Sequence, residues 1–193
     1  SFLSLLKFLF VNNYINVGLI LLLINISGIK NQIKAQTNFY INQNATVKVS
    51  QNAILRINGH LTISSGAVLT QDANNIIALT GDFENNGTLS NNNDTILFTG
   101  DIEQNIKGSA LTLFRVLSIN KTSGKVNLLT PTRIEQSIRL ISNSIFDLTN
   151  NDLTISPTAK IYSDNGITED YTTFSANKCI VNSGSSTDPL EGA

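Results

Sequence analysis

Apolar and polar residues alternate along much of the chain after residue 36. Between residues 47 and 63 the apolar side chains share one parity, and the polar side chains fall between them. The apolar set is Val47, Val49, Ala53, Leu55, Ile57, Leu61 and Ile63, and the polar set includes Lys48, Arg56, Asn58, His60 and Thr62. A period of two places these sets on opposite faces of a β-strand, and no segment after residue 36 keeps a helical period over eleven residues. The pattern predicts an all-β fold of short strands.

Corners of Gly, Asn and Asp separate the predicted strands. The stretch 81–108, GDFENNGTLSNNNDTILFTGDIEQNIKG, shows short apolar pieces between such corners, and the chain contains 26 Asn and 12 Gly but only 3 Pro. Asn and Gly accept left-handed backbone angles, so they suit turns. Units of about 20 residues cannot bury a core alone and therefore stack. We predict a right-handed parallel β-helix (β-solenoid), with an antiparallel β-sandwich as the alternative.

The first 36 residues differ from the rest of the chain. Lys7 stands in a short N-terminal region, Val17–Ile26 forms an apolar core, and Ala35 offers a small residue before Gln36. This arrangement is typical of a cleaved secretory signal peptide. The alternative is a membrane anchor, but ten uninterrupted apolar residues are too few to cross about 30 Å of hydrocarbon. We predict a signal-peptide helix over 1–35, no membrane span after cleavage, and a secreted or outer-surface location.

The net charge and the cysteine content argue against nucleic-acid binding and against a disulfide-stabilised fold. The formal net charge is −1, and loss of the three lysines of the signal segment, Lys7, Lys30 and Lys34, changes it to −4. Such a chain lacks the positive surface that binds nucleic-acid phosphates. The remaining residues, 36–193, suffice for one domain with its own core. The single cysteine, Cys179, allows no intrachain disulfide and lies in an apolar run, so we expect a buried small side chain there.

Two pairs of acidic residues are the main candidates for chemistry. Asp82 and Glu84 follow one glycine, and Asp101 and Glu103 follow another glycine nineteen residues later. If these glycines begin successive turns of a solenoid, the two pairs would lie side by side. Paired carboxylates cleave glycosidic bonds in many enzymes, but a repeat also places acids after its turn glycine, and Lys107 is the nearest cation. We predict that these four acids form a structural row of stacked carboxylates and that this row is a weak candidate for metal binding. We predict no catalytic residue and no cofactor.

A second acidic segment, 162–171 (YSDNGITEDY), carries oxygen ligands of the kind that calcium prefers. These are Asp164, Glu169 and Asp170. The spacing does not fit an EF-hand loop, whose first and twelfth positions would be Ile161 and Thr172. We interpret this segment as a solvated turn and the stretch 91–94 as a corner. The only histidine, His60, has the parity of the polar set, and we predict a surface side chain without a catalytic role.

Four short motifs follow one another between residues 81 and 128. They are GDFENNGT (81–88), FTG (98–100), QNIKG (104–108) and LSINKTSGKVNL (117–128). The set resembles the repetitive β-helical regions of large secreted and cell-surface proteins of Bacteroidota, which are exported by the type IX secretion system. The resemblance covers about residues 45–182. It departs from the usual pattern at residues 142–144, where such repeats often carry Ser-Gly.

The resemblance implies an exported, multidomain protein, of which this chain would be an N-terminal fragment. We predict the solenoid over 36–182 and the start of a linker or a further segment over 183–193, with an uncapped end that self-associates. A stack of turns is a long rigid body whose exposed Asn, Thr and Ser can hydrogen-bond to extracellular glycans or surface proteins. We therefore expect a non-enzymatic structural or adhesive module. The alternative is a spacer or accessory region of a carbohydrate-active enzyme whose catalytic part lies elsewhere.

Overall fold

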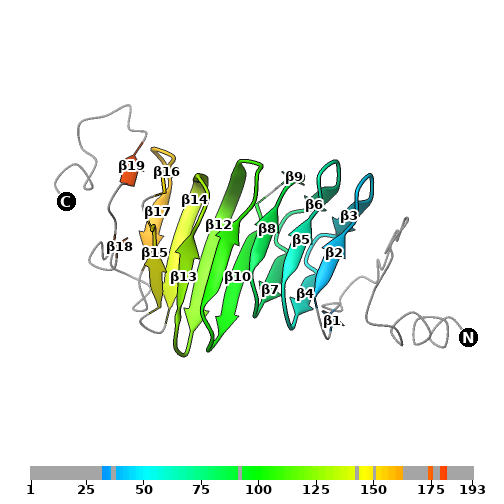
Figure 1. Ribbon diagram of the computed structural model, residues 1–193, viewed down its shortest axis with the longest axis horizontal. Helices are drawn as coiled ribbons and strands as arrows, with labels where there is room; N and C mark the ends of the chain where they lie inside the picture. The colour runs from blue at the N-terminus through cyan, green and yellow to red at the C-terminus, as the bar shows by residue number, and fades with distance from the viewer. Residues whose placement is uncertain are drawn as a thin grey trace, which may run out of the picture.

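The computed structural model describes residues 32–35, 38–90, 93–141, 144–149, 151–162, 174–175 and 179–181, the first and the last two ranges as backbone only. All strand pairs in these residues are parallel, and the strands stack into a β-solenoid of about six turns (Figure 1). The described part contains no helix. The predicted all-β solenoid is therefore confirmed, and the antiparallel sandwich is excluded. Most of the predicted signal peptide lies outside the described residues.

Three parallel sheets form the sides of the solenoid. The seven-stranded sheet contains β2 (Phe39–Ile41), β5 (Leu61–Ile63), β8 (Phe83–Asn85), β11 (Gln104–Lys107), β13 (Lys125–Leu128), β15 (Ile145–Asp147) and β18 (Phe174–Ser175). The three-stranded sheet contains β3 (Thr46–Val49), β6 (Val68–Gln71) and β9 (Thr88–Ser90). The nine-stranded sheet contains β1 (Gln32–Ala35), β4 (Ile54–Ile57), β7 (Ile76–Leu79), β10 (Thr95–Gly100), β12 (Thr112–Lys121), β14 (Thr132–Ile141), β16 (Leu153–Ile155), β17 (Lys160–Tyr162) and β19 (Cys179–Val181).

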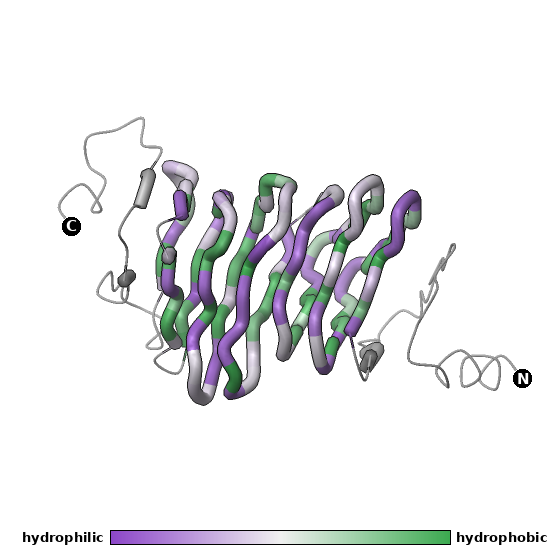
Figure 2. The backbone as a smooth tube through the Cα atoms, viewed as in Figure 1, coloured by the Kyte–Doolittle hydropathy of each residue, from purple (hydrophilic) through white to green (hydrophobic). Residues whose placement is uncertain are grey.

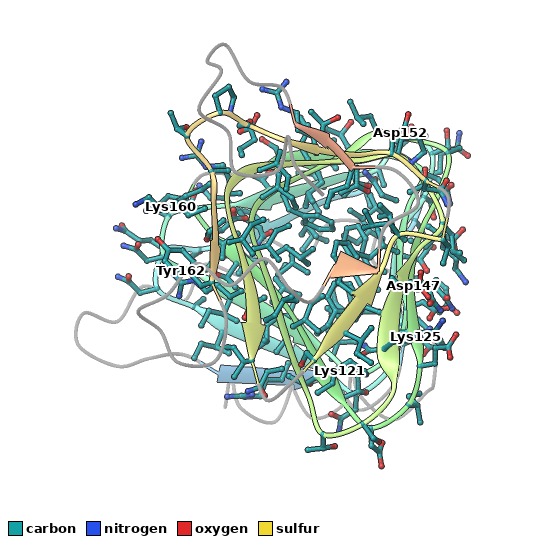
Figure 3. The ribbon with its side chains drawn as sticks, turned by 90° about the vertical axis from the view of Figure 1, so that its left-hand side faces the viewer. Lys121, Lys125, Asp147, Asp152, Lys160 and Tyr162 are labelled. Carbon is teal, nitrogen blue, oxygen red and sulfur yellow. The ribbon has the colours of Figure 1, made fainter. Side chains whose placement is uncertain are left out.

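Apolar side chains from all three sheets fill the interior, in columns that follow the strand register (Figure 3). In the seven-stranded sheet, one column contains four fully buried residues, Leu61, Phe83, Ile106 and Leu128. Each fully buried side chain of this kind contributes about 1.5–3 kcal/mol to folding. The alternation of hydrophilic and hydrophobic residues along each strand is visible in Figure 2. The parity rule applied to residues 47–63 therefore identified the inward positions correctly.

The solenoid changes its cross-section after the third turn. The first three turns contribute one strand to each sheet, whereas the ten-residue strands β12 and β14 replace two shorter strands in the next turns. A β-bulge bends these long strands, because Arg115 in β12 faces two residues, Glu135 and Gln136, in β14. An ion pair joins Arg115 Nη1 to Glu135 Oε2 at 3.5 Å across the bulge. The bend keeps the chain wrapped around the same core without a third strand.

Asparagines occupy left-handed positions at several corners, as the composition predicted. Asn44, Asn52, Asn74 and Asn93 have φ angles of 63°, 61°, 60° and 56°. Asn tolerates this conformation better than other non-glycine residues, because its short side chain hydrogen-bonds locally. Among the residues that the structure describes, no helix is long and apolar enough to span a bilayer.

Candidate functional site

A groove of about 700 Å³ lies on the outer face of the seven-stranded sheet, over β2, β5, β8 and β11. Because side chains alternate between the two faces of a strand, every second residue of these strands faces outward. Parallel pairing then brings the outward residues of successive turns into rows along the solenoid. Three such rows form the floor and the two walls of the groove.

The middle row contains Tyr40, Thr62, Glu84 and Lys107, which are register partners on four successive strands. Thr62 is the smallest of the four side chains and lies between Tyr40 and Glu84 along the row. Tyr40 is 43% exposed, and its hydroxyl accepts a hydrogen bond from Asn38 Nδ2 at 3.3 Å. The row therefore begins with an exposed aromatic ring and ends with a carboxylate and an ammonium group.

Asp82 forms the centre of the first wall. Its Oδ1 accepts hydrogen bonds from the backbone and side-chain amides of Asn105 at 2.9 and 3.1 Å, and its Oδ2 accepts one from Lys107 Nζ at 2.9 Å. Burial acts to raise the pKa of Asp82, but the Lys107 and Asn105 hydrogen bonds and the nearby positive charges outweigh it, so the pKa is lowered. The hydrogen bond with Asp82 raises the pKa of Lys107, although partial burial opposes this. The pair is thus ionised at neutral pH.

His60 lies on the same wall, and its hydrogen bonds connect adjacent turns of the solenoid. Its Nδ1 accepts a hydrogen bond from the Asp82 backbone amide at 2.8 Å, which requires Nδ1 to be unprotonated. Its own amide donates to Asn38 Oδ1 at 2.9 Å. The side chain is 47% exposed, so the predicted surface position is confirmed. Sequence reasoning did not identify the structural role of this residue.

The second wall consists of small polar side chains. Asn86 Nδ2 donates to Glu84 Oε1 at 2.7 Å, and Asn86 Oδ1 accepts hydrogen bonds from the backbone amide and hydroxyl of Ser109 at 2.9 and 3.1 Å. Ser64 lines the groove beside them. This wall therefore offers hydroxyl and amide groups around the Glu84 carboxylate.

The predicted neighbours of Asp82 and Glu84 were wrong. Glu84 is the register partner of Lys107, and Asp82 binds Asn105, so Asp101 and Glu103 do not lie beside the first acidic pair. The nineteen-residue offset does hold between β7 and β10, where Ile76 pairs with Thr95. The corners after β7 and β10 each contain three residues, 80–82 and 101–103. Two further residues at the end of β10 and two at the start of β11 increase the offset to twenty-three, so that Phe83 pairs with Ile106.

Asp101 and Glu103 lie in the corner between β10 and β11. Asp101 and Glu103 are exposed, and Glu103 Oε1 accepts a hydrogen bond from Asn127 Nδ2 at 2.5 Å. Asp82 and Glu84 instead line the groove. In the described ranges, no three His, Cys, Asp or Glu residues gather as metal ligands would. The second acidic segment, with Asp164, Glu169 and Asp170, and the side chain of Cys179 lie outside the described residues.

The predicted corner at 91–94 contains a buried acid. Asp94 is 3% exposed, and neither of its carboxylate oxygens has a hydrogen-bond partner among the described residues. Burial raises the pKa of Asp94 to about 6, although its own backbone amide and the charge of Arg115 act in the opposite direction. Asp94 occupies the place that Asn75 occupies one turn earlier. This acid lies on a different sheet from the groove.

Tyr40, Asn86 and Ser109 are groove residues that sequence reasoning missed. The parity of Tyr40 marked it as outward-facing, but its neighbours could be found only from the offsets between strands. Those offsets are 22 residues from Tyr40 to Thr62 and from Thr62 to Glu84, and 23 residues from Glu84 to Lys107. A spacing near 22 was therefore the signal that could have assembled the row.

The fold and the groove together define a parallel β-solenoid with a polar groove beside one exposed aromatic ring. No family model, no curated protein and no solved structure matches this chain. Its function is therefore argued from the geometry of the groove and from the sequence.

Proposed function

We propose that this protein is a non-enzymatic structural or adhesive module that binds an extracellular glycan in the groove. The observation that carries the proposal is the alignment of the exposed Tyr40 ring with Thr62 and Glu84 on three adjacent strands. A rigid sheet holds these side chains in place, so little entropy is lost when a ligand binds.

The residue types in the groove match the chemistry of a sugar ring. The face of an aromatic ring packs against the C–H groups of a pyranose, and tyrosine provides this apolar surface together with a polar hydroxyl. Carboxylate, amide and hydroxyl groups such as those of Glu84, Asn86 and Ser109 form hydrogen bonds with sugar hydroxyls, and bonds to an ionised partner are the strongest.

The state of Asp82 supports binding rather than catalysis. A glycosidase needs a carboxylic acid with a raised pKa to protonate the leaving group. The pKa of Asp82 is lowered, and three hydrogen bonds hold both of its oxygens. Glu84 has Lys107, not a second acid, as its register partner in β11. These features favour a glycan-binding surface over a hydrolytic centre.

We further propose that the protein is exported and acts at the cell surface, in the manner of the Bacteroidota proteins that its motifs resemble. The support is the pattern of residues 1–36 and the four motifs between residues 81 and 128. The same glycan binding would serve an accessory region of a carbohydrate-active enzyme. An assay of the chain for oligosaccharide cleavage alongside binding separates an enzyme from a binding module.

Binding of the wild-type chain to an array of oligosaccharides, followed by calorimetry on the best ligand, tests this proposal. We expect Tyr40→Ala to weaken binding at least tenfold. Tyr162→Ala is the control, because Tyr162 lies on the nine-stranded sheet and the groove lies on the seven-stranded sheet. In Figure 3, Tyr162 lies on the opposite side of the solenoid from Lys125 and Asp147, which belong to the seven-stranded sheet. Circular dichroism checks that both variants fold. Absence of binding to every glycan, or equal binding by Tyr40→Ala, would overturn the proposal.

A further inference from the structure

The groove contains two carboxylates but only one lysine. Lys107 interacts with both: it donates a hydrogen bond to Asp82 Oδ2, and the negative charge of Glu84 helps to raise its pKa. One positive charge and two negative charges leave the groove with a net charge of −1 when His60 is neutral.

The excess negative charge resides on Glu84. Asp82 has both oxygens engaged and forms an ion pair with Lys107 at 2.9 Å. Glu84 accepts one hydrogen bond, from Asn86 Nδ2, and within the described ranges no ion pair joins it to a cation. Its carboxylate is therefore the groove's free acceptor for a positive or hydrogen-bonding group of a ligand.

The position of Glu84 relative to Tyr40 determines where the positive or hydrogen-bonding group of a ligand would lie. Tyr40 and Glu84 are separated by one strand, through Thr62, so their backbones are about 9.6 Å apart. A pyranose stacked on Tyr40 extends over Thr62 toward Glu84. The substituents on the far edge of this ring, or on the next sugar, meet the carboxylate.

We propose that Glu84 is a specificity-determining residue that makes the groove select amino sugars over neutral sugars and neutral sugars over uronic acids. An ammonium substituent forms a charge-assisted hydrogen bond with the free carboxylate, a hydroxyl forms an ordinary one, and a uronate carboxylate is repelled. This inference rests on the proposed glycan binding by the same groove and adds the class of sugar to it.

Three tetrasaccharides that share a β-1,4-linked glucan backbone form the test series. They are cellotetraose, its 2-amino counterpart and its C6-oxidised glucuronate counterpart. Calorimetry at about pH 6, where sugar amines are protonated and carboxylates are ionised, measures binding to the wild-type chain and to Glu84→Gln. Glutamine keeps the shape of the side chain and an oxygen for Asn86 Nδ2. Asp101→Asn is the control, since it removes one exposed negative charge outside the groove.

For the wild-type chain we expect the amino sugar to bind at least tenfold more tightly than cellotetraose and the glucuronate to bind most weakly. Glu84→Gln should reduce the preference to less than threefold, and Asp101→Asn should leave it unchanged. Raised salt should weaken the preference, because salt screens charge interactions at an exposed site. Equal binding of the three ligands to the wild-type chain, or a preference retained in Glu84→Gln, would overturn this inference while glycan binding stands. Absence of binding to all three and to the array would overturn both.

Discussion

The ammonium group of Lys121 donates a hydrogen bond to the side-chain oxygen of Gln104 at 2.6 Å, inside the corner that follows β10. The same ammonium donates to the backbone oxygen of Ile102 at 2.6 Å, and Gln104 Nε2 donates to the backbone oxygen of Gly81 at 2.7 Å. Lys121 is 1% exposed, and its burial lowers the pKa of the amine, although the charge of Asp101 opposes this. A chain of polar contacts thus links the corner before β11 to the corner before β8, one turn earlier.

Replacement of Lys121 by methionine should destabilise the fold by about 1–3 kcal/mol, because the buried side-chain oxygen of Gln104 and the partly buried backbone oxygen of Ile102 lose their donor. Gln104→Met should cost a similar amount, since the Gly81 oxygen also loses its partner. If the two side chains act as a unit, the double variant should cost less than the sum of the single variants. Urea denaturation of all four proteins measures the coupling. Strict additivity would show that the Lys121–Gln104 hydrogen bond contributes nothing.

Replacement of Asp94 by asparagine should stabilise the protein at pH 7 by about 1–3 kcal/mol, since a buried charge without a partner is lost. Asn75, one turn earlier, shows what an amide does at this place: its Nδ2 donates to the backbone oxygens of Val49 and Asp72 at 3.0 and 2.5 Å. A carboxylate has no such donor, whereas the asparagine of the variant does.

The effect of this variant should depend on pH. The folded pKa of Asp94 is about 6, above the ordinary value of 3.8, so the stability linked to its protonated form is fully present below 3.8. It is lost as the pH rises through about 6. The gain from Asp94→Asn should therefore be small at pH 4 and largest above pH 6, when thermal midpoints are compared across this range. Asp101→Asn serves as the control, and a gain that is constant with pH would contradict the assignment.

Replacement of Asp82 by asparagine should produce the opposite pH dependence. The folded pKa of Asp82 lies below its ordinary value, so its contribution to stability is present above pH 3.8 and is lost as the pH falls through the folded pKa. We expect Asp82→Asn to cost about 1–2 kcal/mol at pH 7, through loss of the Lys107 ion pair, and almost nothing in strong acid. Chemical denaturation at the two pH values checks this, and an equal loss at both would point to packing alone.

Replacement of Gly108 by alanine should be more disruptive than the same change at Gly100. Both glycines have positive φ angles, 134° and 96°, that disfavour other residues. At Gly108 an added Cβ would overlap the backbone oxygen of Asn85, whereas at Gly100 it would meet Thr80 Cβ at an ordinary 3.6 Å. Gly100→Ala should cost about 1 kcal/mol. Gly108→Ala should lower the thermal midpoint several times further, and similar shifts for both variants would show that the close approach is unimportant.

Local rules accounted for much of the architecture. The shared parity of Leu117, Ile119 and Lys121 puts all three side chains on the inner face of β12, and the structure buries each of them. That pattern could indicate an inward lysine, but it could not identify Gln104 as its partner, because Gln104 lies seventeen residues earlier on a strand of a different sheet. The exposed position of His60 followed from parity too, whereas its hydrogen bond to the Asp82 amide did not.

By itself, the sequence determined the strands, their inward faces, the corners of Gly and Asn, and the stacking of turns, since each follows from residues close together in the chain. The tertiary structure alone decided which residues of different turns become neighbours. Ile76 and Thr95 are nineteen residues apart, whereas Phe83 and Ile106 are twenty-three apart, although both pairs join the third turn to an adjacent turn. Two added residues at the end of β10 and two at the start of β11 set this offset, and local sequence patterns do not show which residues of the next turn they will face. The groove that unites Tyr40, Glu84 and Lys107 depends on those offsets, so it emerges only when the turns are stacked.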